Sequence, residues 1–100
     1  MPIELEEREA GCSLRLVGPI DIRCALELKE LLLRGLGHAG GLQVELAAMT
    51  RADTLALQML WAAQRDAGGA GRGFAFEGAV QPPVAQMLHD AGLKLLGALL

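Results

Sequence analysis

Hydrophobic and polar positions alternate at the start of the chain in a way that predicts two strands. Apolar and acidic residues alternate over residues 3–7, and polar and apolar residues alternate again over residues 13–17. A period of two is typical of a half-buried strand. Ala10-Gly11 lies between the two runs and is typical of a turn. The pattern therefore predicts a hairpin whose first strand lies at the edge of a sheet.

One amphipathic helix is expected after the hairpin. Gly18-Pro19 is expected to end the second strand, and Asp21 is a candidate N-cap because its carboxylate can accept from free amides of the next turn. After Asp21, apolar residues recur at helical spacing between positions 25 and 36, with charged residues on the other side. A series of glycines is expected to break this helix: Gly35, Gly37, Gly40 and Gly41.

The second half of the chain is predicted to form strands that alternate with helices. The pattern predicts a strand over 42–46, a loop over 50–54, a helix over 55–66, a strand over 74–77, and a last helix from Pro82-Pro83 to its C-cap Gly92. The order β-β-α-β-α-β-α indicates an α/β fold with a mostly parallel sheet of four to five strands, an antiparallel edge strand and helices packed on the sheet. We expect one domain over residues 1–100.

Composition narrows the class of protein. Of 100 residues, 52% are hydrophobic and 3% aromatic, so the core must be aliphatic. The formal net charge of −3 supplies no basic face for nucleic acid. No apolar run approaches the roughly 20 residues of a membrane span, and the acidic start is unlike a secretory signal. We therefore expect a cytoplasmic protein that does not bind nucleic acid or insert into a membrane.

Motifs for catalysis, metal or cofactor binding are weak. The glycine-rich stretch 68–73 follows a predicted helix and precedes a predicted strand, which is the reverse of a phosphate loop, and no Gly-Lys-Ser/Thr follows it. His89 adjoins Asp90, but no serine or cysteine has a local motif that suggests a nucleophile. The two histidines and two cysteines lack metal-ligand spacing. We expect no enzyme activity, no cofactor and no metal.

Asp53-Thr54, before the helix over 55–66, has two interpretations. Either residue can cap the helix by satisfying its free amides. A hydroxyl at a helix N-terminus is also held near the positive end of the helix dipole, and phosphorylating it would add up to about two negative charges beside Asp53. A partner surface matched to the neutral hydroxyl would then be repelled.

Several segments together resemble the STAS domain family, named for sulfate transporters and anti-sigma factor antagonists. Val44-Glu45-Leu46, a short loop and then Ala52 to Leu60 resemble the family's hydrophobic strand followed by Asp-Ser/Thr at a helix start. Gly18 to Ile22 is similar to its Gly-x-Ile-Asp element. Phe76-Glu77-Gly78 and the helix after it are similar to its closing strand and helix. The resemblance covers nearly the whole chain.

The resemblance implies a non-enzymatic bacterial regulator of signal transduction and transcription. In partner-switching systems of this family, such a domain binds a kinase-type anti-sigma factor, and phosphorylation of the Ser or Thr ends the binding. Carried over, Thr54 takes the phosphoacceptor position. The partner would contact the Gly18–Asp21 loop and the start of the following helix, through the residues Ile20, Asp21, Asp53, Thr54, Leu55, Ala56 and Gln58.

Departures from the family pattern keep alternatives open. Glu45 stands where Asp is usual, Leu55 replaces a small residue and Ala56 replaces the usual Gly. Relatives of the Asp-Thr type include constitutive STAS subunits of bacterial lipid-transport ABC complexes and STAS proteins of chemotaxis systems. The leucine-rich tail, 93–100, favours such a constitutive subunit or scaffold, since exposed apolar surface often marks an interface. A nucleotide- or anion-binding domain is a further alternative, and the sequence leaves open whether the chain forms a homodimer.

Overall fold

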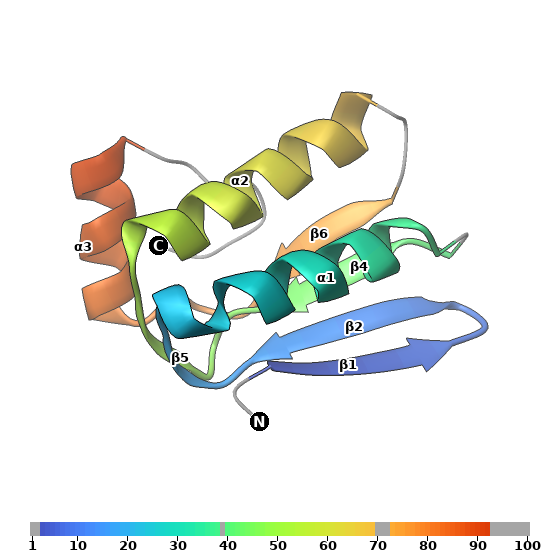
Figure 1. Ribbon diagram of the computed structural model, residues 1–100, viewed down its shortest axis with the longest axis horizontal. Coiled ribbons are helices and arrows are strands. Elements are labelled where there is room, and N and C mark those ends of the chain that lie inside the picture. Colours follow the sequence, from blue (N-terminus) through green and yellow to red (C-terminus); the bar gives the residue numbers. More distant parts are fainter. Residues whose placement is uncertain (1–2, 39, 70–72, 93–100) are drawn as a thin grey trace.

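The computed structural model describes residues 3–38, 40–69 and 73–92. Within them, a four-stranded sheet has the order β1-β2-β4-β6 (Figure 1). Its strands are β1 (Ile3–Arg8), β2 (Gly11–Leu16), β4 (Leu42–Glu45) and β6 (Phe74–Glu77). β1 runs antiparallel to β2, whereas β2, β4 and β6 are parallel to one another. The predicted α/β fold with a mostly parallel sheet and an antiparallel edge strand is confirmed.

Helices cover one face of this sheet (Figure 1). The helical segments are η1 (Ile22–Cys24), α1 (Ala25–Leu36), α2 (Thr54–Gly69) and α3 (Pro82–Ala91). α1 packs over β1 and β2, and α2 packs over β6. α3 packs beside α2 and against the short strand β5 (Met49–Ala52), at the end of the molecule where α2 begins. None of the described helices is long and apolar enough to cross a membrane.

Buried and exposed side chains lie on opposite faces of the sheet. Leu14, Val44 and Phe76 are buried under the helices. Their neighbours Arg15 and Glu77 are exposed on the opposite face. Parallel sheets are usually covered on both faces. Here no described element covers the second face, and its polar residues keep it compatible with water.

A second, two-stranded sheet was not predicted. β3 (Gly18–Ile20) and β5 (Met49–Ala52) pair in parallel. β2 ends before Gly18-Pro19 as expected, but this dipeptide begins a further strand. The expectation that 50–54 is a loop is wrong. Each strand is too short to show a period, and its partner lies far away in the sequence, so only the folded chain brings them together.

Glycines break the helices less than expected. α1 continues through Gly35 to Leu36, and α2 continues through Gly68 to Gly69. A Cβ on Gly35 would lie 2.7 Å from a methyl group of Leu42, so the absent side chain lets α1 approach β4 closely. The predicted start of α3 at its prolines and its left-handed C-cap, Gly92 with φ 67°, are confirmed. The leucine-rich tail, 93–100, lies outside the described residues.

Candidate functional site

The two segments singled out in the sequence meet at one end of the molecule. β3 and β5 are parallel neighbours, so the residues that follow them emerge side by side. The backbone N–H of Asp53 donates to the carbonyl of Ile20 at 3.2 Å and extends this pairing by one step. The pairing of β3 with β5 therefore brings the Gly18–Asp21 segment next to the start of α2.

Asp53 is the N-cap of α2, and Thr54 is its first residue. The Asp53 Oδ1 atom accepts from the backbone N–H of Ala56 at 2.9 Å, and the Asp53 carbonyl accepts from Leu57 N–H at 3.2 Å. This is the geometry of a capped helix. The side chain of Thr54 is exposed to solvent. Capping therefore occupies the carboxylate of residue 53 and leaves residue 54 facing outward.

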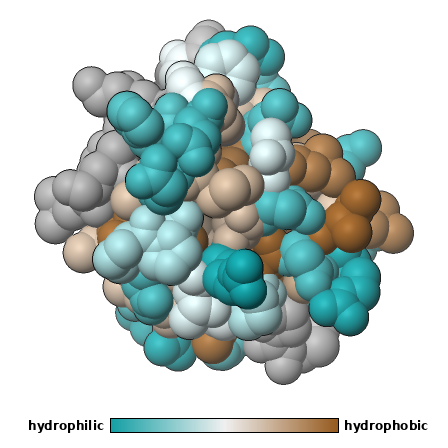
Figure 2. Space-filling view, turned by 90° about the vertical axis from the view of Figure 1, so that its left-hand side faces the viewer, coloured by the Kyte–Doolittle hydropathy of each residue, from teal (hydrophilic) through white to brown (hydrophobic). Residues whose placement is uncertain are grey.

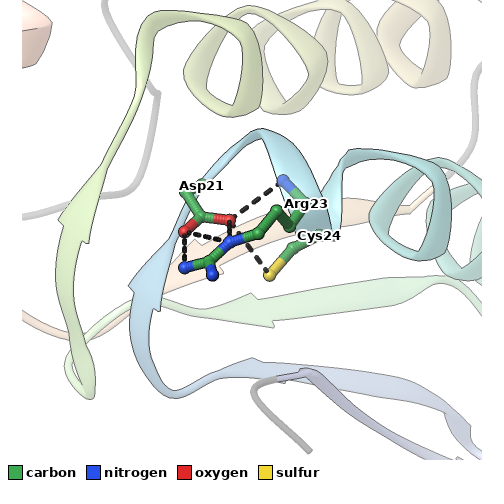
Figure 3. Close-up of polar contacts among 3 residues, drawn as sticks. All are labelled: Asp21, Arg23 and Cys24. Atoms are coloured by element: carbon green, nitrogen blue, oxygen red, sulfur yellow. Dashed lines mark hydrogen bonds and ion pairs between the residues drawn. The ribbon is translucent and has the colours of Figure 1, made fainter.

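Asp21 is held by its own neighbours at the start of η1 (Figure 3). Its Oδ1 accepts from the Arg23 backbone N–H at 2.9 Å, and its Oδ2 accepts from the Arg23 guanidinium at 2.6 and 3.1 Å. The Cys24 thiol lies 3.9 Å from Oδ1. These bonds, above all the side-chain bond to Arg23, hold the pKa of Asp21 below its usual value. Asp21 is thus a charged, locally fixed carboxylate beside the start of α2.

Burial divides the predicted contact residues into two groups. Thr54, Leu55 and Gln58 are exposed, and Asp21 and Asp53 are half-buried. Ile20 and Ala56 are each only 1% exposed and belong to the hydrophobic core. These two side chains pack in the core beneath the site. The surface that a partner could contact is formed by the other five predicted residues, which are the two half-buried aspartates and the three exposed residues of α2.

A groove of about 550 Å³ adjoins these residues. Asp21 and Asp53 line it together with Arg51 of β5 and with α3, through Pro83, Gln86 and Met87. No local pattern in the sequence marks the α3 residues as part of the site, because their position depends on how α3 packs against β5. Figure 2 views this end of the molecule and shows polar side chains interspersed with hydrophobic patches.

Several large apolar side chains that adjoin Asp21 and Thr54 in the sequence are exposed to solvent. Ile22, which follows Asp21, is 67% exposed, and Leu55, which follows Thr54, is 41% exposed. Leu26 on the next turn is 69% exposed. Sequence analysis identified Leu55 as a contact residue but not Ile22 or Leu26, since Ile22 was placed in the Gly-x-Ile-Asp element and Leu26 among the apolar positions of the helix. Apolar side chains flanked by fixed charges are well suited to protein contacts.

The described residues offer little for catalysis. Every buried side chain among them is hydrophobic, and the thiol of Cys12 is the one titratable group in that buried set. Burial raises the pKa of this thiol, which disfavours the reactive thiolate. They contain no group of three or more histidine, cysteine, aspartate or glutamate residues that could hold a metal. The Thr54 side chain lies on an exposed surface beside the carboxylate of Asp53.

Comparisons with known proteins agree with this fold. Residues 3–99 match the family model described as "Mlab, STAS domain". An anti-sigma factor antagonist from Mycobacterium paratuberculosis superimposes with a TM-score of 0.73 at 20% identity, over 90% of this chain and 76% of that one. A variant of RsbS from Moorella thermoacetica gives 0.73 at 22% identity, over 99% and 85%. The unphosphorylated anti-sigma factor antagonist SpoIIAA gives 0.67 at 11% identity, over 91% and 84%. No curated protein matches the chain significantly.

Proposed function

The chain belongs to the STAS domain family, and from this premise we propose that it is a non-enzymatic regulatory module that binds another protein. The docking surface consists of Asp21, Asp53, Thr54, Leu55 and Gln58 together with the exposed Ile22, and it includes the groove beside α3. We propose a protein partner of the kinase-type anti-sigma factor class in the bacterial cytoplasm. Structurally similar proteins described as anti-sigma factor antagonists support this assignment.

The observation that carries the proposal is the exposed hydroxyl at the first residue of α2. Asp53 already caps the helix, so Thr54 has no capping role and its side chain faces solvent. Ile22, which follows Asp21, and Leu55, which follows Thr54, are both exposed and supply apolar contact area to the same docking surface.

Phosphorylation of Thr54 is the proposed control. It would place about two negative charges next to the carboxylate of Asp53, at the edge of a groove that also contains Asp21. The free amides at the start of α2 offset part of this charge. A partner surface fitted to a neutral threonine would face a strongly anionic one after the modification, and the complex would dissociate.

The test combines a kinase assay with a binding assay. The protein is incubated with the kinase-type anti-sigma factor of its source organism and ATP, and its intact mass is measured. Wild type should gain one phosphate and Thr54→Ala none, while Thr50→Ala, which changes an exposed threonine on β5, should behave as wild type. In the binding assay Thr54→Glu should weaken the complex and the uncharged Thr54→Gln should weaken it less. Equal binding by Thr54→Glu and wild type would remove the docking surface from this position.

A constitutive subunit or scaffold is the second candidate. The exposed Leu55 favours it, because a bulky apolar residue beside the acceptor gives a permanent interface an anchor and obstructs access of a kinase. This reading predicts a stable complex with a transporter ATPase or a chemotaxis component that survives purification, and no phosphate on Thr54. Leu55→Ala should then weaken the complex more than Thr54→Glu.

A further inference from the structure

A second groove lies between β1 and α1, at the opposite edge of the sheet from β6. Its volume is about 590 Å³. Its floor is apolar, formed by the buried Ile3 and by Leu5 and Leu31, which pack against the core. No residue of the proposed docking surface lines this groove.

The rim of this groove is acidic. Glu7, Glu27 and Glu30 line it, and Arg34 is the one basic residue among its lining side chains. Arg34 Nε lies 2.6 Å from Glu7 Oε1, so these two charges neutralise each other. Glu27 and Glu30 form no ion pair with any other residue that the structure describes. The groove thus presents two unpaired carboxylates above an apolar floor.

The strand beside the groove has an open edge. β1 pairs with β2 and, within the described part of the chain, with no other strand. In an antiparallel edge strand, alternate residues direct their backbone N–H and C=O groups away from the sheet. An extended peptide can bind such an edge as an added strand, with its alternate side chains entering the neighbouring groove.

Charge decides which occupant fits. A second copy of β1 would bring the same glutamates together, since Glu4 and Glu6 share this strand with Glu7. Like charges on neighbouring strands oppose pairing. Nucleic acid and anionic lipid are repelled for the same reason. A positively charged segment with apolar side chains matches both the rim and the floor.

We propose that the edge of β1 and the groove beside α1 bind an extended, basic segment of a partner protein. The backbone of the segment pairs with β1. Its lysine or arginine side chains meet Glu27 and Glu30, and its apolar side chains cover Leu5 and Leu31. This surface is separate from the one around Thr54, so the module can hold two protein segments at once.

A synthetic peptide tests the proposal. The probe is a short fluorescent peptide with lysine and valine in turn at every second position and threonine between them, so that one face of the added strand carries both lysine and valine. Binding to the full chain is followed by anisotropy at low salt. We expect saturable binding that weakens about fivefold in the double variant Glu27→Gln/Glu30→Gln, as expected for the loss of two exposed charge pairs. The matched control Glu45→Gln/Glu77→Gln removes two carboxylates from the opposite face of the sheet, and its affinity should change by about twofold or less. Glu27 and Glu30 form no ion pair to lose, so the groove variant should be only slightly less stable than wild type, by the interaction of Glu27 with the first turn of α1.

Further probes separate strand addition from general attraction. A peptide with glutamate in place of lysine should not bind, and a peptide N-methylated at alternate amides should lose its affinity because it cannot pair with β1. Thr54→Glu should leave the affinity unchanged. Equal weakening by the two glutamate variants, retention of the N-methylated peptide, loss of affinity in Thr54→Glu, or no saturable binding to wild type would each overturn the proposal.

Discussion

Replacing Asp53 separates two roles that one side chain combines. Its carboxylate caps α2 through a bond of 2.9 Å to Ala56 N–H, and its charge lies beside Thr54. Asp53→Ala removes both the bond and the charge. Asp53→Asn removes the charge and keeps an oxygen that can accept the same bond, because asparagine and aspartate are about equally good N-caps.

The size of the effect follows from what else holds the helix. α2 has 16 residues, and its inner face buries Ala56, Leu57, Leu60, Ala63 and Ala67. Most of its stability therefore comes from packing, and losing one cap should not unfold it. We expect Asp53→Ala to lower the free energy of unfolding by about 1 kcal/mol, within the roughly 0.5–2 kcal/mol seen for caps. For a domain of this size that is a fall of about 4–8 °C in Tm.

Urea unfolding of wild type, Asp53→Ala and Asp53→Asn at neutral pH measures the two effects. Asp53→Asn should retain most of the stability that Asp53→Ala loses. Both variants should bind the partner more weakly. In Asp53→Asn the first turn of α2 keeps its capping bond, so the weaker binding of that variant reports the lost charge alone. If Asp53→Asn is destabilised as much as Asp53→Ala, the stabilisation comes from charge and the helix dipole, and the capping argument is refuted.

Three further outcomes are expected. Gly35→Ala should lower the free energy of unfolding in urea by about 1 kcal/mol. Crowding of the new methyl group against Leu42 costs roughly 1–3 kcal/mol, which exceeds the gain of about 1 kcal/mol in helix propensity. A stabilised variant would contradict the close approach of α1 to β4. The pKa of Asp21 is lowered in the folded state, so its charge stabilises the fold at pH values above the ordinary pKa of aspartate, and this stabilisation is lost as the pH falls through the folded pKa. The Tm difference between wild type and Asp21→Asn should therefore shrink on acidification. A difference that stays constant with pH would contradict this prediction. Burial raises the pKa of Cys12 and shields it, so iodoacetamide should label the half-buried Cys24 first in the native protein, as read by peptide mass analysis.

The sequence predicted the elements that have their own periodic pattern. β1 and β2 alternate over several residues, and α1 and α2 have apolar faces several turns long, so each could be recognised locally. β3 and β5 could not, because a strand of three or four residues has too few positions for a period and is stabilised by a distant partner. Gly35 was misjudged for a related reason, since local propensity disfavours glycine within a helix while packing against Leu42 requires it.

The candidate site was predicted in part. The capping pattern placed Asp53 and Thr54 at the helix start, where the structure has them. Nearness to a motif in sequence did not predict exposure, because Ile20 and Ala56 point into the core. The contribution of α3 to the groove depends on the packing of α3 against β5, which no local pattern encodes.

The position of Thr54 is fixed mainly by the residue before it. Asp53 uses all its polar groups: its N–H donates to Ile20 of β3, its carbonyl accepts from Leu57, and its carboxylate accepts from Ala56. The first bond ties the end of β5 to the end of β3, and the other two set the first turn of α2. Two of the three bonds belong to the backbone and remain in any variant that keeps the fold, so Thr54 should keep its place when the charge of Asp53 is removed. A binding defect in Asp53→Asn with unchanged stability would therefore measure the contribution of that charge to recognition, without a contribution from displacement of the hydroxyl.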